Sequence, residues 1–286
     1  MGLNRPTIFS LDLGHKNSKM KTITYHNDWQ KSWKESFVYD QVEVFNNYTT
    51  KQLGYRNAYK MRQERTFSLI RKHLPVGSTI LDIAAAQGNF SLLLAEEGYK
   101  ITWNDLREEL IDYVKMKYEK GQIEYLAGNC FDVCKNRLYD AVLITEIIEH
   151  VAHPDEFLTL VSNLVKPGGY IIMTTPSGEY FKNKLPKFSE YATPEDFESV
   201  QFKPNSDGHI FLLYEEELRD LGQKANLKVV DMSIHSNPLT GGHIKLHKVL
   251  PFIPNSIVAG IEKATQKLPS SLRKKLHSSW AVIYQK

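Results

Sequence analysis

The stretch from Thr79 to Asp105 constrains the fold of this chain more than any other. It reads TILDIAAAQGNFSLLLAEEGYKITWND: a short apolar run, a turn of small residues, a helical segment and a second apolar run that ends in an acid. The run 79–83 is typical of a buried parallel strand, and small residues at 84, 85, 86 and 88 let a ligand approach the backbone. Asp105 follows Asp82 by 23 residues, where a carboxylate can accept hydrogen bonds from ribose hydroxyls. The stretch predicts a nucleotide-binding turn.

The turn lacks the glycine pattern of a pyrophosphate site. That pattern is G-x-G-x-x-G, whereas Ala84, Ala86 and Gly88 are the small residues here and Asn89 fills the last place. A nucleoside without phosphates therefore fits better than a dinucleotide. A nicotinamide-dependent oxidoreductase remains a weaker alternative.

Composition indicates one large α/β domain with appended segments. The chain has 286 residues, of which 42% are hydrophobic and 24% charged, and its net charge of +3 is too small to indicate a nucleic-acid partner. The basic cluster 273–275 is expected to be a solvated helical face. Cys130 and Cys134 form no metal or disulfide framework, which is typical of a reduced cytosolic protein. The sequence has no secretory h-region and no long apolar window, so we expect a cytoplasmic, soluble protein.

Strand-like and helix-like segments alternate along most of the chain. Apolar runs predict one strand at 79–83 and a second that ends at residue 105. Further strands are predicted at 123–127, 141–145, 170–174, 227–232 and 280–284. Helical spacing appears at 57–74, around Leu110, around Val161 and around Leu218. This order is typical of a doubly wound, mostly parallel sheet. Residues 1–56 are polar and aromatic and are expected to form an N-terminal arm or helical cap.

Two inserts interrupt the alternation. The first, 175–212, follows the fifth strand, at the edge where open α/β sheets bind ligands, so it is expected to be an acceptor lid. Its aromatic residues Tyr180, Phe181, Tyr191 and Phe202, together with Trp29 and Trp33, are candidate pocket walls or ordinary lid core. The second, 238–278, has apolar residues at helical spacing with lysines between them. We expect a helical cover or a dimer surface there, with a membrane or lipid-substrate surface as the alternative.

From about residue 57 to 286 the chain resembles class I S-adenosylmethionine-dependent methyltransferases. The cofactor turn D-x-G-x-G-x-G is matched by residues 82–88, the ribose acid by Asp105, the adenine loop by 128–130, the fourth strand by YDAVLITEIIEHV and the fifth by LVKPGGYIIMTTPS. The resemblance implies a seven-stranded sheet with an antiparallel last strand. It also implies a set of cofactor-binding residues: Asp82, Ala84, Ala86, Gly88, Asn89, Phe90, Asp105, Leu106, Asn129, Cys130 and Thr145.

This chain departs from the family pattern at three positions. Ala84 and Ala86 stand where the family has glycine, and their Cβ atoms cause strain if the backbone φ is positive there. Asn129 stands where an acid often receives the adenine amino group, and its amide oxygen can accept the same bond.

The segment Glu146-Ile147-Ile148-Glu149-His150 holds candidate groups for acceptor chemistry. If it is helical, Glu146, Glu149 and His150 share one face, where they could bind Mg²⁺ or Mn²⁺. E-x-x-E-H resembles the metal site of small-RNA 2′-O-methyltransferases and the matching segment of ubiquinone-pathway O-methyltransferases. In the RNA enzymes a downstream histidine completes the site, and His209 is the candidate here. The alternatives are that His150 or His209 acts as a general base, or that these side chains only pack locally.

We therefore expect an S-adenosylmethionine-dependent methyltransferase that O-methylates a small-molecule or natural-product hydroxyl. A metal-dependent RNA 2′-O-methyltransferase is one alternative. A non-catalytic methyltransferase-like binding protein is another, supported by the two alanines in the turn. Monomer and homodimer are both compatible with the sequence.

Overall fold

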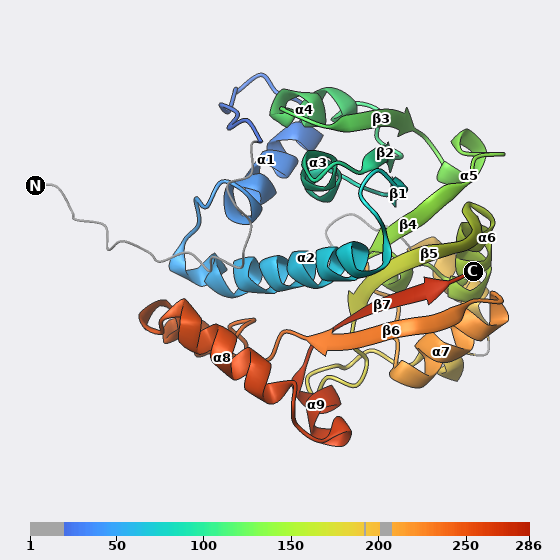
Figure 1. Ribbon diagram of the computed structural model, residues 1–286. Helices are drawn as coiled ribbons and strands as arrows, with labels where there is room; N and C mark the ends of the chain where they lie inside the picture. The colour runs from blue at the N-terminus through green and yellow to red at the C-terminus, as the bar shows by residue number, and fades with distance from the viewer. Residues whose placement is uncertain (1–19, 192, 201–207) are drawn as a thin grey trace, which may run out of the picture.

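The computed structural model describes residues 20–191, 193–200 and 208–286. Seven strands form one sheet in the order β3-β2-β1-β4-β5-β7-β6. All neighbouring strands are parallel except β7, which runs antiparallel to both β5 and β6 (Figure 1). This confirms the predicted doubly wound sheet with its antiparallel last strand. The strands are β1 Thr79–Ile83, β2 Lys100–Asp105, β3 Gln122–Ala127, β4 Tyr139–Thr145, β5 Val165–Pro176, β6 Lys228–His235 and β7 Ser279–Gln285.

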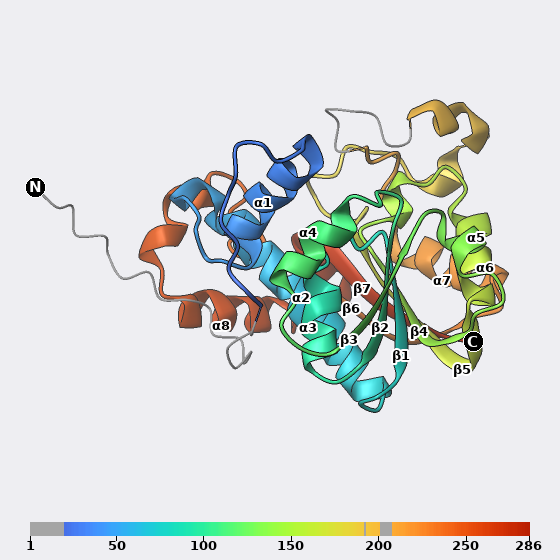
Figure 2. The same ribbon diagram turned by 90° about the horizontal axis from the view of Figure 1, so that it is seen from above.

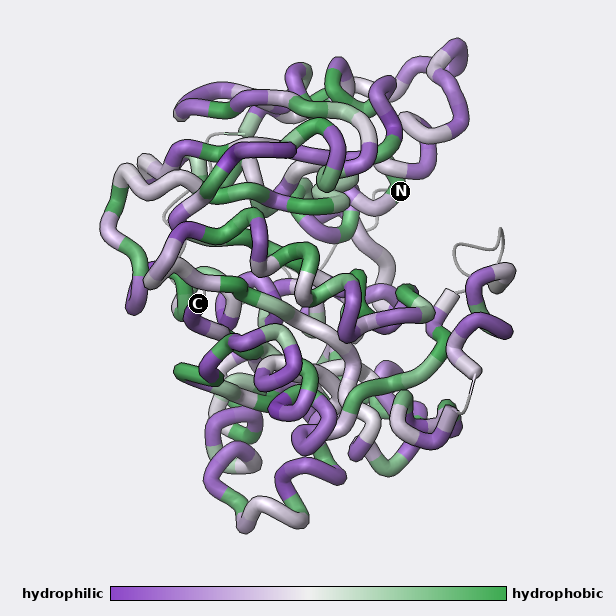
Figure 3. Tube along the Cα trace, turned by 90° about the vertical axis from the view of Figure 1, so that its right-hand side faces the viewer, coloured by the Kyte–Doolittle hydropathy of each residue, from purple (hydrophilic) through white to green (hydrophobic). Residues whose placement is uncertain are grey.

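Side chains that alternate along the central strands pack in two separate hydrophobic cores, one on each face of the sheet. Ile80, Leu143 and Ile172 pack with α2 and α3 on one face, whereas Leu81 and Ile144 pack with α5, α6 and α7 on the other. Because both faces of the sheet are covered, the central strands β1 and β4 are apolar along most of their length, and green segments run through the middle of the molecule in Figure 3. The covering helices are α2 Leu53–His73, α3 Asn89–Glu96, α4 Leu110–Lys117, α5 Cys130–Val133, α6 Pro154–Asn163 and α7 Glu215–Lys224.

In the described part of the expected N-terminal cap, from residue 20 onward, the first helix is α1 at Lys31–Glu43. It lies beside α4 (Figure 2). A 3-10 turn at Thr50–Gln52 leads into α2, which begins at Leu53, four residues before the predicted start. Leu74 follows α2, and Pro75 then prevents its continuation.

Both inserts leave the sheet from its carboxyl edge. β6 is parallel to β5, so the first insert after Pro176 and the second after His235 start from the same side. Tyr180 Oη and His243 Nδ1 form a hydrogen bond that joins the two inserts. The second insert contains α8 Asn255–Thr265 and α9 Ser270–Leu276, and α8 lies alongside α2 (Figures 1 and 2). No helix within the described ranges is long and apolar enough to cross a bilayer.

Candidate active site

The predicted nucleotide turn connects β1 to α3 at the carboxyl edge of the sheet. Its backbone is left-handed at alternate residues, with φ of +51° at Ala84, +47° at Ala86 and +70° at Gly88. A Cβ at Gly88 would lie 2.8 Å from Val114 Cγ1, so only glycine fits there. The two alanines adopt a conformation that costs about 1–2 kcal/mol per non-glycine residue. Their departure from the glycine pattern therefore strains the turn.

Asp105 lies at the end of β2 and is 4% exposed. Its Oδ2 accepts a hydrogen bond from Ala86 N at 2.9 Å, which ties the turn to β2. Arg107 closes over the same carboxylate, with Nε 2.8 Å from Oδ1 and Nη2 3.1 Å from Oδ2. A ligand hydroxyl that binds Asp105 must share or replace this ion pair, in which the Arg107 side chain is half-exposed.

A small pocket opens at the carboxyl end of β1. Six of the predicted cofactor-binding residues line it, and so does Glu146: the six are Asp82, Ala84, Ala86, Asn89, Phe90 and Thr145. Burial raises the pKa of Asp82 to about 7, although Ser91 Oγ donates to its carboxylate at 2.6 Å. Glu43, Tyr59 and Arg62, which come from α1 and α2, line the same pocket and were not predicted.

The remaining predicted cofactor residues do not line this pocket. Asn129 Oδ1 caps α5 by accepting from Phe131 N at 3.0 Å, and a second lone pair on this oxygen is left for a ligand. Cys130 is buried in the apolar core, and burial raises its pKa to about 12, so its thiol is neutral. Leu106 is 71% exposed at the rim.

Glu149, His150 and His209 converge beyond the end of β4; we call them the Glu149 cluster. One ligand atom of each lies within 4.8 Å of the others. Glu149 Oε1 is 3.9 Å from both His150 Nε2 and His209 Nε2, and the two rings are 4.8 Å apart. Ile210 N donates to Glu149 O at 2.9 Å, which fixes the segment of His209 against the cluster. The structure thus brings His209, the downstream histidine that the family resemblance suggested, beside Glu149 and His150.

Glu149 is completely buried, and its two oxygens differ. Oε2 accepts from Thr175 Oγ1 at 3.0 Å, whereas Oε1 has no hydrogen-bond partner among the described residues. Burial raises the pKa of Glu149 well above its ordinary value, and the nearby Glu146 carboxylate raises it further. An unsatisfied buried carboxylate oxygen beside two imidazoles is a donor set that fits a divalent cation.

Glu146 does not join this cluster. The segment forms a short 3-10 turn at Ile148–His150 instead of an α-helix, and Glu146 precedes it with a φ of +56°. Its carboxylate turns to α2, where Arg62 Nη1 lies 3.0 Å from Oε2. The prediction that Glu146, Glu149 and His150 share one helical face is therefore wrong, because Glu146 points to α2 and the other two residues belong to the Glu149 cluster.

The predicted aromatic pocket walls lie in different places. Trp29 and Trp33 of the N-terminal cap pack on Tyr113 of α4, so they join the cap to α4 and are not walls beside the Glu149 cluster. Tyr191 packs on Phe197, and Phe181 is 50% exposed. Tyr180 contacts His243 of the second insert. Phe202 lies outside the described residues.

Comparison with known proteins decides the family. A model of the methyltransferase domain matches residues 53–232, which is more than half of the chain. The chain belongs to the class I S-adenosylmethionine-dependent methyltransferases.

Curated relatives and solved structures agree with this family. The chain is 25% identical over 169 residues to a ubiquinone biosynthesis O-methyltransferase of Shewanella halifaxensis, covering 57% of this chain and 70% of the relative. It is 28% identical over 172 residues to the Acinetobacter baylyi protein of the same name, with 57% and 69% covered. A methyltransferase structure from Archaeoglobus fulgidus shares the fold with a TM-score of 0.51 at 18% identity, covering 87% of this chain and 99% of that one.

In this methyltransferase, a buried ionic network that the sequence did not reveal holds the turn between β1 and α3. Lys117 Nζ of α4 is 2.7 Å from Asp40 Oδ2 of α1, from Gln87 O and from Asn89 Oδ1. Tyr113 Oη also donates to Asp40 Oδ2 at 2.7 Å. The side chains of Asp40 and Lys117 are both fully buried. We call these four side chains, of Asp40, Asn89, Tyr113 and Lys117, the α1 clamp, because they fasten the cap to the turn.

We expect Asp105→Asn to weaken binding of S-adenosylhomocysteine about 10- to 100-fold, because charge-assisted hydrogen bonds to ribose hydroxyls are lost. Isothermal titration calorimetry measures the change. Arg107→Met is the matched control: it removes the guanidinium from the same carboxylate and should leave binding equal or tighter. Unchanged binding by Asp105→Asn would remove Asp105 from the cofactor site.

Proposed function

We propose that this methyltransferase methylates a hydroxyl oxygen of a small-molecule acceptor bound at the Glu149 cluster through a divalent cation. The observation that carries the proposal is the buried Glu149 Oε1, which accepts no hydrogen bond from the described residues and lies 3.9 Å from both imidazole Nε2 atoms. A free hydroxyl is a poor nucleophile at neutral pH, so a cation or a base must lower its pKa.

The cofactor supplies the methyl group from its sulfonium. The protein's own residues bind and orient the two reactants. Asp105 and the strained turn hold the nucleoside of the cofactor, and the Glu149 cluster holds the acceptor oxygen. One carboxylate and two imidazoles favour Mn²⁺ over Mg²⁺, because Mg²⁺ prefers oxygen ligands. Without a cation, His150 and His209 are the candidate general bases for the same hydroxyl.

Two observations support a small-molecule hydroxyl as the acceptor. The first insert contacts the chain beyond β4 at two points: Ile210 N donates to Glu149 O, and Glu198 Oε1 lies 2.9 Å from His153 Nε2. The relatives from Shewanella and Acinetobacter are named as O-methyltransferases of ubiquinone biosynthesis. A hydroxylated ring compound is the acceptor class that we propose to test first.

We expect EDTA to lower turnover of a hydroxylated acceptor at least about tenfold, and Mn²⁺ to restore it. Methyl transfer is followed by mass spectrometry with deuteromethyl-labelled cofactor. Calorimetry with S-adenosylhomocysteine serves as the control and should not change with EDTA, because Asp105 and the turn lie outside the cluster. Turnover that EDTA leaves untouched would exclude the cation and favour His150 or His209 as base.

A further inference from the structure

The second insert exposes an unusual number of large apolar side chains. Within the described ranges, six such residues lie between 244 and 272: Ile244, Val249, Phe252, Ile257, Ile261 and Leu272. Phe252 is 85% exposed, which is more than any other large apolar side chain in the described ranges. Apolar residues scattered singly are normal on a surface, whereas exposed apolar residues that gather into a patch mark an interaction site.

The same insert is strongly basic. Residues 238–278 contain seven Lys or Arg and one acid, Glu262, whereas the rest of the chain has 29 basic and 32 acidic residues. Glu262 is 1% exposed, so its carboxylate lies beneath the surface. Lys245, Lys248, Lys263 and Lys267 are exposed and pair with no acid in the part of the chain that the structure describes. The positive charge of this otherwise nearly neutral protein is concentrated on the insert.

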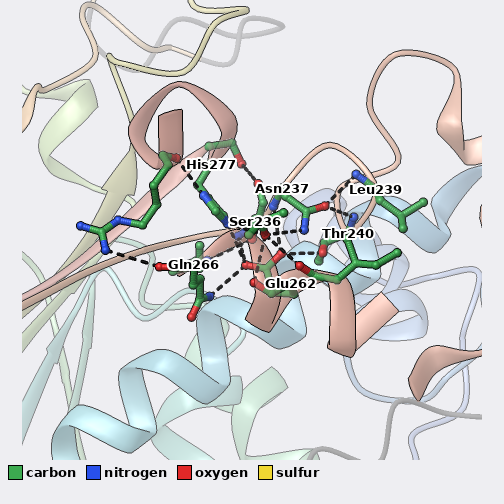
Figure 4. A network of polar contacts seen from close by, with 12 residues as sticks. Ser236, Asn237, Leu239, Thr240, Glu262, Gln266 and His277 are labelled. Carbon is green, nitrogen blue, oxygen red and sulfur yellow. Dashed lines mark hydrogen bonds and ion pairs between the residues drawn. The ribbon is translucent and has the colours of Figure 1, made fainter. Parts of the chain in front are cut away.

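Glu262 fixes the orientation of this surface (Figure 4). Its Oε1 accepts from Ser236 N at 2.8 Å, and its Oε2 accepts from Asn237 N at 3.0 Å and Thr240 Oγ1 at 2.6 Å. These bonds attach α8 to the chain that leaves β6. Val258 lies one turn before Glu262 on the same buried face of α8. Ile257 and Ile261, also one turn apart, are therefore held on an outer face.

We propose that the second insert docks on the surface of an anionic lipid bilayer, with its apolar side chains in the interface and its lysines at the headgroups. Exposed aliphatic and phenyl groups interspersed with lysine are the pattern of interfacial membrane binding. RNA would neutralise the lysines but leave Ile244, Val249 and Ile257 in water. A symmetric dimer through this surface would bring like charges together, which opposes association.

Docking through this surface brings the catalytic edge of the sheet to the bilayer. The insert starts where β6 ends, at the carboxyl edge that also carries the Glu149 cluster. The Tyr180–His243 hydrogen bond links it to the first insert. This inference does not depend on the proposed acceptor chemistry, because it is tested by binding alone.

The test is co-sedimentation with vesicles. We expect the wild-type protein to sediment with vesicles of equimolar phosphatidylcholine and phosphatidylglycerol, to bind vesicles of phosphatidylcholine alone at least about tenfold more weakly, and to dissociate as salt rises. Phe252→Ser with Ile257→Ser, and Lys245→Glu with Lys248→Glu, should each weaken binding about tenfold or more.

Matched variants at the amino edge control for unspecific effects. Val76→Ser removes an apolar side chain that is 69% exposed, and Lys100→Glu with Lys228→Glu reverses two exposed charges at the starts of β2 and β6. Both should bind vesicles like the wild type, and thermal unfolding confirms that every variant folds. Equal loss in test and control variants overturns the proposal. So does tighter binding to single-stranded RNA than to vesicles, or a dimer that Phe252→Ser with Ile257→Ser dissociates without affecting sedimentation.

Discussion

Lys117→Met should destabilise this methyltransferase by about 3–5 kcal/mol, because it leaves the buried Asp40 carboxylate without its cation. The Lys117 ammonium also donates hydrogen bonds to Gln87 O and Asn89 Oδ1, so the substitution removes two hydrogen bonds that hold the turn between β1 and α3. Burial lowers the pKa of Lys117 below its ordinary value, and the adjacent Asp40 carboxylate opposes this shift by favouring the charged ammonium. Thermal denaturation should show a midpoint lower by about 10 °C.

Asp40→Asn combined with Lys117→Met separates the ionic effect from lost packing. With both charges gone, no unpaired ion is buried, so most of the lost stability should return. Tyr113→Phe removes one bond to Asp40 and should cost only about 1 kcal/mol. A single Lys117→Met variant as stable as the wild type would show that the α1 clamp contributes little to stability.

The sheet was predictable because its signal is local. Apolar runs such as 79–83 and 141–145 are buried on both faces, and their alternation with helices fixes a parallel arrangement. The antiparallel last strand came from the family resemblance, because alternation alone carries no strand order. The positions of Asp105 and of the turn followed from their place at strand ends.

Contacts between distant segments were not predictable from local sequence patterns. Lys117 reads as a solvated lysine on an amphipathic helix, and only the fold brings it to Asp40, 77 residues earlier. Helical spacing put Glu146 beside Glu149, but the left-handed backbone at Glu146 directs it to Arg62. The convergence of His209 with His150 was predicted from the family motif and not from spacing.

Glu149→Gln should lower turnover about 100- to 1,000-fold while leaving S-adenosylhomocysteine binding unchanged. Glutamine fills the same volume and can keep the hydrogen bond from Thr175 Oγ1, but it lacks the negative charge that attracts a cation. Steady-state kinetics and calorimetry measure the two quantities. Glu146→Gln is the matched control, because it removes a nearby carboxylate that faces Arg62, and it should reduce turnover much less.

The pH dependence of stability distinguishes a metal role of Glu149 from a structural one. Without a cation, the folded protein keeps the Glu149 proton above the ordinary pKa of 4.5, because burial raises the pKa. The folded state then binds more protons than the unfolded state, so stability falls as pH rises from about 4.5 through the raised pKa. The Glu149→Gln variant should not show this loss of stability with rising pH, and in EDTA at neutral pH it should be more stable than the wild type. Added Mn²⁺ should stabilise the wild type and not the variant, because only the ionised carboxylate binds it. Equal stabilisation of both proteins by Mn²⁺ would place the cation elsewhere.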